Sequence, residues 1–328
     1  MKVGVLDLLT TPARSWSERA YHLVLTKQYA AIMPQAIAVW SRRLGHATSY
    51  ATYYGLGDPR RRLPDDLDVI FVSAYTQVSG LAYALAKHYR ARGTRTVIGG
   101  PHAAAFPADC RRFFDLVVRS CDEAVIADVL AGRFDPGAVV ASDRPLADLP
   151  SIAERWSEVR ASAFAFGRRP TVATTIPLLA SLGCPYHCDF CVDAAEPYRQ
   201  LPLDRLAADL RTIAERAPGT LVAFHDPNFA VKFDQVLDVL AAVPPARRSP
   251  YIVETSLGIL RGERATRLGS TGCGFLAPGV ESWSAYGEKS GVGGRSGAAK
   301  VDRLVEHFAT LSRHVPYLQA NFLFGLES

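Results

Sequence analysis

The sequence contains little of several features that mark particular classes of protein. Only 6 of its 328 residues are Cys, and no apolar run approaches the length of about 20 residues that a membrane-spanning helix needs. The longest strongly apolar stretches are as short as Val69–Val72 and Ile176–Ala180. The first residues do not join a basic start to an apolar run and a small-residue cleavage site. We therefore expect no disulfide scaffold, no secretion and no membrane span, and we place the protein in the cytoplasm.

The charge balance of the chain is mild. Its 37 Lys and Arg residues against 32 Asp and Glu residues leave a net charge of +5, and only 6 of the basic residues are Lys. The single tight basic run, Arg60-Arg61-Arg62, precedes Pro64-Asp65-Asp66 and is typical of a solvated loop; a phosphate-binding role is the alternative. Hydrophobic residues make up 48% of the chain, enough to bury a core. We expect no nucleic-acid partner.

Residues 1–134 alternate strand and helix patterns. Strands are expected at Lys2–Leu9, His46–Tyr54, Asp68–Ala74, Thr94–Gly99 and Phe114–Arg119. Helices are expected at Trp16–Leu44, Leu81–Arg92 and Glu123–Leu130. The apolar strands are of the kind buried on both faces of a parallel sheet. This pattern predicts an α/β domain with a doubly wound, flavodoxin- or Rossmann-like parallel sheet.

Residues 135–172 contain several prolines and no sustained strand period, so we interpret them as an interdomain linker with a helix around Ile152–Ser162. Residues 173–328 return to β-α alternation. Strands are expected at Thr174–Ser181, Leu221–His225, Tyr251–Thr255, Phe275–Val280 and Tyr317–Phe324, and helices at Leu203–Arg216, Lys232–Val243, Arg264–Leu268 and Gly297–Arg313. The pattern predicts a partial β/α barrel, truncated after its fifth strand, with its working face at the carboxyl ends of the strands.

Three cysteines lie close together in a loop that follows an expected strand. Cys184, Cys188 and Cys191 have the spacing C-x3-C-x2-C. Three thiolates this close can hold three corners of one iron–sulfur cubane. The fourth iron then has no protein ligand and can be chelated by a small molecule. A zinc site that adds His187 is the alternative, although such sites usually combine two separated pairs of ligands.

This pattern, with the aromatic Phe190 before the last cysteine, resembles the radical S-adenosylmethionine (SAM) superfamily. Further motifs follow in order: FHDPNF at Phe224–Phe229, GVES at Gly279–Ser282 and NFLFGLE at Asn321–Glu327. The resemblance covers essentially all of Pro170–Ser328. It implies a [4Fe-4S] cluster on the three cysteines, with SAM chelating the open iron. The contacts of SAM that it implies are Phe190, Asp226, Glu281, Ser282 and Asn321.

Each of the secondary positions has a structural alternative. Asp226 and Asn228 are also the residue types that cap a turn and a following helix. Glu281 could face a neighbouring Arg in place of a ligand. Gly325 is more typical of a tight turn than of a ligand contact.

A doubly wound domain ahead of such a barrel resembles the cobalamin (B12)-binding members of the superfamily. Relatives have a Ser or Thr at the end of the third strand and a Gly-Gly pair at the end of the fourth. The positions here are Ser73 and Gly99-Gly100, and Tyr75, Thr76 and Gln77, which follow Ser73, are candidates to line the same mouth. The resemblance implies cobalamin contacts at Ser73, Thr76, Gly99 and Gly100.

One departure concerns the cobalt ligand. Many cobalamin domains carry D-x-H-x-x-G after the first strand, but Asp7–Pro12 contains no His. Cobalamin would then bind with its cobalt free of a protein imidazole, a state suited to methyl transfer; the alternative is a domain that binds nothing. His102 invites a ligand hypothesis, but we favour a hydrogen-bonding His of the surface or a loop.

The resemblance implies an enzyme that cleaves SAM reductively to a 5′-deoxyadenosyl radical, with electrons from an external donor of the flavodoxin or ferredoxin type. We expect a methyltransferase that acts on an unactivated carbon or phosphorus of a small molecule or peptide. A cyclase or rearrangement enzyme without methyl transfer is one alternative. A non-catalytic cobalamin- or cluster-binding module and a zinc-binding regulator are the others.

Overall fold

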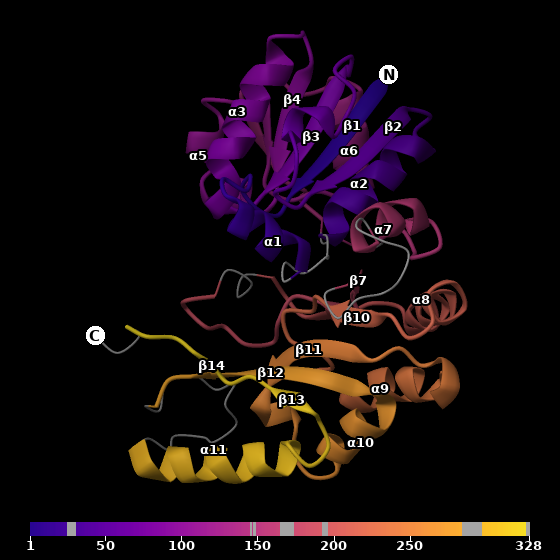
Figure 1. The fold of residues 1–328 in the computed structure, drawn as a ribbon, viewed down its shortest axis with the longest axis vertical. Coiled ribbons are helices and arrows are strands. Elements are labelled where there is room, and N and C mark those ends of the chain that lie inside the picture. The colour runs from indigo at the N-terminus through magenta and orange to yellow at the C-terminus, as the bar shows by residue number, and fades with distance from the viewer. Residues whose placement is uncertain are drawn as a thin grey trace. The chain divides into compact units, whose positions relative to one another are not determined.

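The computed structural model describes residues 1–24, 31–144, 146, 149–164, 174–191, 196–283 and 297–325. The chain divides into two compact units, Met1–Thr175 and Ile176–Ser328. Each unit contains one main sheet with helices packed beside it (Figure 1). Among the described residues, none of the helices combines the length and the apolar character that crossing a bilayer requires.

The first unit is built on a six-stranded parallel sheet with the order β2-β1-β3-β4-β5-β6. Its strands are β1 (Lys2–Leu8), β2 (Ala47–Tyr53), β3 (Val69–Ala74), β4 (Arg95–Gly99), β5 (Leu116–Val118) and β6 (Ala138–Val140). The order reverses between β1 and β3, because β2 lies on one side of β1 and β3 on the other. This confirms the predicted doubly wound sheet and gives it a switch point at the carboxyl ends of β1 and β3.

Seven helices accompany this sheet among the described residues. They are α1 (Trp16–Val24), α2 (Ile32–Arg43), α3 (Ser79–Arg90), α4 (Pro101–Ala105), α5 (Pro107–Cys110), α6 (Glu123–Leu130) and α7 (Trp156–Ala163). The prediction of one continuous helix over Trp16–Leu44 is wrong, because Ala31 has an extended backbone and α2 begins after it. Pro34 explains the break: it is tolerated in the first turn of a helix but clashes with the preceding turn inside one.

The two faces of the first sheet differ in polarity. Alternate residues of a strand point to opposite faces. Leu6 and Leu8 of β1 join Ile70 and Val72 of β3 in an apolar core that includes α3. The other face, which α2 and α7 cover, receives Asp7 and polar side chains from these helices. Both faces bury apolar side chains, such as Val5 and Trp40 on the α2 side, and the α2 side also buries hydrogen-bonded polar groups.

Helix α7 is tied to the first unit by buried polar contacts. Arg155, at its start, donates from Nη1 to Gln35 Oε1 at 2.6 Å and from Nε to the Pro150 carbonyl at 3.0 Å. Glu158 is buried and pairs with Arg42 of α2. Strand β6, which pairs with β5, also lies in the range interpreted from sequence as a linker. Sequence reasoning missed β6 because three residues are too few to show a period.

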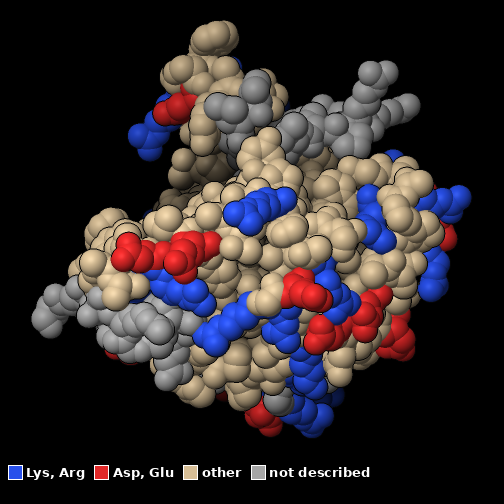
Figure 2. All heavy atoms as spheres, turned by 90° about the horizontal axis from the view of Figure 1, so that it is seen from below, with Lys and Arg blue, Asp and Glu red and all other residues tan. Residues whose placement is uncertain are grey.

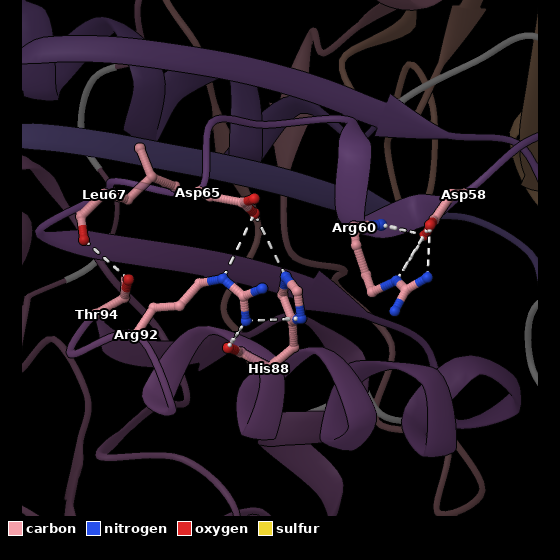
Figure 3. Close-up of polar contacts among 7 residues, drawn as sticks. All are labelled: Asp58, Arg60, Asp65, Leu67, His88, Arg92 and Thr94. Atoms are coloured by element: carbon pink, nitrogen blue, oxygen red, sulfur yellow. Dashed lines mark hydrogen bonds and ion pairs between the residues drawn. The ribbon is translucent and has the colours of Figure 1, made fainter.

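The basic run lies in the connection between β2 and β3. Asp58 caps a short 3-10 turn: its carboxylate accepts from the backbone N–H of Arg60 at 3.0 Å and from the Arg60 guanidinium (Figure 3). Arg62 donates to the carbonyl of Leu56. This is the solvated loop that the sequence predicts, with Arg60 held by a neighbouring acid.

The second unit contains strands in the order β13-β12-β11-β10-β7, and β14 also pairs with β12. They are β7 (Thr175–Leu178), β10 (Leu221–Phe224), β11 (Tyr251–Ser256), β12 (Cys273–Glu281), β13 (Tyr317–Leu318) and β14 (Asn321–Phe322), and a small ribbon joins β8 (Ser181–Leu182) to β9 (Arg199–Gln200). The helices are α8 (Leu203–Arg216), α9 (Phe233–Ala242), α10 (Arg264–Thr271) and α11 (Gly297–Leu311). The predicted partial β/α barrel is confirmed, with its fifth strand split into β13 and β14.

Charges of both signs are interspersed on the surface seen in Figure 2. Ion pairs of this kind link neighbouring helices of the second unit. Arg267 of α10 reaches Asp234 and Asp238 of α9, each with an N–O distance of 2.6 Å. Such exposed pairs contribute little stability individually, about 0 to 1 kcal/mol.

Candidate functional site

The carboxyl edge of the first sheet brings together residues that are distant in sequence. The pairing register places Asp7 of β1 beside Ser73 of β3, and Ser73 beside Gly99 of β4. The three residues therefore form a row across neighbouring strand ends. This row begins at the switch point, where open α/β sheets bind their ligands.

The two glycines of this edge are needed for different reasons. Gly100 has a φ of +89°, and a Cβ there would lie 3.1 Å from the backbone N and O of Ala74 and from Ser73 Oγ. Both the conformation and the crowding favour glycine at this position. At Gly99 a Cβ would meet only the Val118 carbonyl, at 3.6 Å. The backbone conformation of Gly99 tolerates a side chain. A larger residue there would instead fill space at this edge of the sheet.

Asp7 is completely buried at this edge. Its Oδ2 accepts a hydrogen bond from the Ala31 N–H at 2.9 Å, whereas Oδ1 has no hydrogen-bond partner among the described residues. Burial raises the pKa of Asp7 to about 7, so the group is partly protonated at neutral pH. Sequence reasoning noted Asp7 only as the start of a segment without His. The signal it missed is a charged residue inside an otherwise apolar strand.

A chain of hydrogen bonds leads away from Thr76, which lies in the 3-10 turn that follows β3. Its Oγ1 is 3.2 Å from His102 Nδ1, and His102 Nε2 is 2.6 Å from the Tyr83 hydroxyl. Tyr83 in turn donates to Asp109 Oδ2 at 2.7 Å. The expectation of a hydrogen-bonding His102 is confirmed, but its expected place on the surface or in a loop is wrong: it lies in α4 and is only 3% exposed.

In the second unit, the cysteine motif follows β8 and its three thiols are free of disulfides. Cys184 is buried, and Cys188 and Cys191 are partly exposed. Cys184 N donates to the Glu196 carbonyl at 3.2 Å, which anchors the start of the loop. Gly183 makes this approach possible, because its φ is +64° and a Cβ would lie 2.3 Å from the Pro197 carbonyl.

Within the parts of the chain that the structure describes, no three Cys, His, Asp or Glu side chains converge on one metal ion. Three thiols spaced closely in one loop are the donor set that an iron–sulfur cubane takes, one thiolate to each of three irons.

Asp226, just beyond the end of β10, holds the chain that leads into the cysteine motif. Its Oδ2 accepts from Ala180 N at 3.0 Å, and its Oδ1 accepts from Ser181 N at 2.5 Å and Ser181 Oγ at 2.6 Å. Burial raises the pKa of Asp226 to about 6, and these hydrogen bonds oppose the rise. Both oxygens of Asp226 therefore bind the segment after β7, a role that its sequence position did not predict.

Asn228 also binds a neighbouring strand. Its Oδ1 accepts from Ser256 N at 2.9 Å and from Thr255 Oγ1 at 3.2 Å, at the end of β11. The expectation that Asn228 caps the following helix is therefore wrong, since Lys232 occupies the cap position of α9. Asn228 thus joins two neighbouring strand ends by side-chain hydrogen bonds, and sequence spacing does not reveal such partners.

Glu281 ends β12 in a strained conformation. Its φ is +67°, which is uncommon for a residue other than glycine. A Cβ on Gly279 would lie 2.3 Å from Glu281 Oε1, so the side chain turns back over that glycine. Asn321 of β14 pairs in register with Gly279, and Ser282 is buried. The structure therefore groups Glu281, Ser282 and Asn321.

The remaining predicted SAM contacts lie on other parts of this edge. Asp226 lies beside the segment after β7, and Phe190 is half-buried next to Cys191. Gly325 has a φ of +87°, in keeping with the turn expected there. Glu327, the last residue of the NFLFGLE motif, lies outside the described residues.

No protein-family model matches the chain. Among curated proteins it is similar to bacteriochlorophyllide d C-12(1)-methyltransferase of Chlorobaculum tepidum, with 21% identity over 280 residues, covering 81% of this chain and 59% of that protein. Among solved structures it is similar to the radical SAM methyltransferase TsrM from Kitasatospora setae with cobalamin and a [4Fe-4S] cluster bound. The TM-score is 0.62 at 16% identity, covering 97% of this chain and 69% of TsrM. A second similar structure is the cobalamin-dependent SAM radical enzyme OxsB with aqua-cobalamin bound, with a TM-score of 0.68 at 13% identity, covering 98% of this chain and 49% of OxsB.

This chain has the fold of the cobalamin-dependent radical SAM enzymes. The family resemblance inferred from the cysteine motif and from the Ser73 and Gly-Gly positions is thus confirmed at the level of fold. The likeness extends over both units, since 97% and 98% of the chain are covered. The chain spans 59% of the curated relative, less than two thirds of its length.

Proposed function

We propose that this chain binds the cofactors of a cobalamin-dependent radical SAM enzyme whose reaction is methyl transfer. The observation that carries the proposal is the cysteine motif, placed directly after the first strands of the second unit in a chain with this fold. Two similar proteins, TsrM and the Chlorobaculum tepidum protein, are described as methyltransferases. This favours methyl transfer over a cyclisation or rearrangement that uses the same cofactors.

The residues of the second unit fit an iron–sulfur cluster with SAM. Cys184, Cys188 and Cys191 would hold it, and the chemistry of such a cluster is the reductive cleavage of SAM to a 5′-deoxyadenosyl radical. Asp226 keeps the segment before the loop in place through Ala180 and Ser181. Contacts to SAM are assigned to Phe190, Asp226, Glu281, Ser282 and Asn321. Asp226 has an acceptor site left on Oδ2, which accepts only the bond from Ala180 N.

The residues of the first unit fit a large flat cofactor laid against the sheet edge. Gly99 adds no side chain there, and Gly100 lets the backbone turn tightly against Ala74. Ser73 and Thr76 add hydroxyl groups at the end of the neighbouring strand, β3. Cobalamin, when bound, supplies a transferable methyl group. No His follows Asp7 within the segment Asp7–Pro12, so this segment provides no imidazole for cobalt.

The partners follow from this chemistry. Reduction of a cluster requires an external electron donor, for which a flavodoxin or ferredoxin is suited, and the cytoplasm is the compartment where free thiols persist. A small molecule or peptide is the proposed substrate. In support, a structure of TsrM, similar to this chain with a TM-score of 0.59, is described with a tryptophan substrate and a SAM analogue bound.

The test is anaerobic purification with iron–sulfur reconstitution and added hydroxocobalamin, followed by metal analysis. We expect about four irons and about one cobalt per chain. Cys188→Ala should lose nearly all of the iron, because a cubane held by two thiolates is poorly retained. Cys121→Ala, which removes a thiol of the first unit, is the matched control and should keep the iron.

Each outcome has a distinct meaning for the proposal. Iron retained in Cys188→Ala would contradict the assignment of the cluster ligands, and zinc in place of iron would end the proposal. Iron without cobalt would mean that the chain binds a cluster but no cobalamin, which contradicts the cobalamin part of the proposal. With both cofactors present, SAM cleavage supports an enzyme over a binding module. A product heavier by one CH2 then distinguishes methyl transfer from cyclisation.

A further inference from the structure

We propose that Thr76 presents a hydroxyl oxygen that can only accept a hydrogen bond, and that His102, acting as a positioning residue through Tyr83 and Asp109, fixes this polarity. The group that binds Thr76 must then be a neutral donor, either a carboxamide N–H of the corrin or a ribose O–H of the nucleotide tail. The phosphate of that tail is excluded. This inference rests on the proposed cobalamin site and deepens it.

The argument starts at the far end of the hydrogen-bond chain. Asp109 pairs with Arg112 at 3.2 Å and is a carboxylate, which only accepts hydrogen bonds. Tyr83 has one hydroxyl proton, and it gives this proton to Asp109 Oδ2 at 2.7 Å. Burial raises the pKa of Tyr83, so the hydroxyl keeps its proton. The oxygen of Tyr83 therefore receives its other hydrogen bond from His102.

This fixes the tautomer of His102. The 2.6 Å contact to Tyr83 requires the proton on Nε2. Burial lowers the pKa of His102, so the ring is neutral and Nδ1 carries a lone pair. The neighbour of Nδ1 is Thr76 Oγ1, at 3.2 Å. Thr76 must donate its only hydroxyl proton to this nitrogen, because two acceptors do not form a hydrogen bond.

The ring positions make this arrangement rigid. Tyr83 stacks on Phe113 with ring centroids 4.1 Å apart, and His102 lies 5.3 Å from the ring of Phe106. His102 is buried, whereas Thr76 is exposed. The hydrogen-bond chain thus runs from the partly exposed Asp109, through the buried ring of His102, to the exposed oxygen of Thr76. That oxygen has lone pairs but no free proton, so an ionised phosphate, which also only accepts, would be repelled there.

The position of Thr76 connects it to the proposed cofactor. It follows β3, and His102 follows β4; these two strands are neighbours in the sheet. Ser73, Gly99 and Gly100 lie at the same strand ends. A cofactor laid on this edge therefore meets Thr76 together with the strand end at Gly99.

The experiment measures the dissociation constant of hydroxocobalamin with the full chain, using Thr76→Val, which keeps the volume and removes the hydroxyl, and Thr76→Ser, which restores it. We expect Thr76→Val to bind about three- to tenfold more weakly and Thr76→Ser to bind like the unmodified chain. Unchanged binding by Thr76→Val would overturn the inference. An unmodified chain that takes up no cobalamin would instead mean that the proposed function has failed.

A double-mutant cycle tests the role of His102. In the chain that keeps Thr76, His102→Phe should weaken cobalamin binding about twofold to threefold, because the Thr76 hydroxyl is no longer held. In the Thr76→Val background, His102→Phe should have no further effect. Equal losses in both backgrounds would mean a merely structural role and would overturn the assignment. Tyr83→Phe, which frees the other tautomer of His102, should show the same dependence on Thr76 and serves if His102→Phe does not fold.

The control and the second ligand complete the design. His88→Phe removes a histidine of the same unit that contacts Asp65 and Arg92 (Figure 3), and it should leave binding unchanged. Cobinamide lacks the nucleotide tail. If the loss caused by Thr76→Val persists with cobinamide, the donor is a corrin carboxamide; if it disappears, the donor is a ribose hydroxyl of the tail.

Discussion

Asp7 in the first unit and Asp226 in the second lie at comparable places, at or just beyond the carboxyl end of a parallel strand, and both are buried. Burial raises the pKa of each above its ordinary value. They differ in what surrounds the carboxylate. Asp226 accepts three hydrogen bonds from Ala180 and Ser181, whereas Asp7 Oδ1 has no partner within the part of the chain that the structure describes.

The difference shows that burial alone does not give a carboxylate its role. A fully hydrogen-bonded carboxylate stabilises the backbone that it binds, and removing it leaves buried donors unsatisfied. A carboxylate with an unpaired oxygen carries an uncompensated desolvation cost whenever it is ionised. We therefore expect removal of the Asp226 side chain to destabilise the fold, and removal of the Asp7 charge to stabilise it.

The largest effect is expected for Asp226→Ala. The two backbone N–H groups and the hydroxyl bound by Asp226 would lose their acceptor, at roughly 1 to 3 kcal/mol each. We expect the second unit to lose about 4 kcal/mol of stability, with faster hydrogen–deuterium exchange in the segment that contains Ala180 and Ser181. A loss below about 1 kcal/mol would contradict the comparison. Asp234→Ala, which removes an exposed acid of α9, is the control.

The next effect is expected for Asp7→Asn and has the opposite sign. The folded pKa of Asp7, about 7, lies above the ordinary 3.8, so the folded state binds its proton more tightly than the unfolded state. The stability that this proton provides is complete below pH 3.8 and is lost as the pH rises through 7. Asn does not titrate, so the variant lacks this loss.

Asp7→Asn should therefore be more stable than the unmodified chain at pH 8, by between about 1 and 4 kcal/mol, and the difference should shrink towards pH 4. Denaturant unfolding followed by tryptophan fluorescence measures this, because Trp40 is buried in the first unit. A variant less stable at pH 8 would show that the ionised carboxylate has a partner that offsets its burial.

The smallest effect is expected for Ser73→Ala. Ser73 lies beside Asp7 in the strand register, and its hydroxyl lowers the pKa of Asp7, against the effect of burial. Without this hydroxyl the pKa of Asp7 should rise further and the chain should lose about 1 kcal/mol at pH 8. At pH 4, where Asp7 is protonated in both chains, the difference should be smaller. The same loss at both pH values would mean that Ser73 acts independently of Asp7.

Much of the fold could be predicted because its signals are local. Helices α6 (Glu123–Leu130) and α8 (Leu203–Arg216) have the expected bounds. In α6 the Asp122 side chain accepts from Val125 N at 2.9 Å, a cap that is visible in the sequence. The break at Ala31 was missed because the apolar period continues across it, although Pro34 was a signal for it.

The candidate site was predicted only where covalent spacing defines it. The cysteine motif and the Gly-Gly pair are consecutive or nearly consecutive in the chain, so their grouping does not depend on packing. Asp226 binding Ala180, and His102 binding Thr76, are contacts between segments that meet only when neighbouring strands pair. No local pattern in the sequence encodes such partners.

The sequence by itself determined the alternation of strands and helices, the two-part organisation and the identity of the clustered thiols, because apolar periodicity and residue spacing are properties of the chain. Only the tertiary structure decided which polar groups at the strand ends are satisfied. Strand register sets those partners: it places Asp7 beside Ser73, with one oxygen unpaired among the described residues, while Asp226 meets the backbone that leads into the cysteine loop. Hydrogen bonding in a buried site depends on distances between atoms from different strands, and those distances exist only after the sheet has formed.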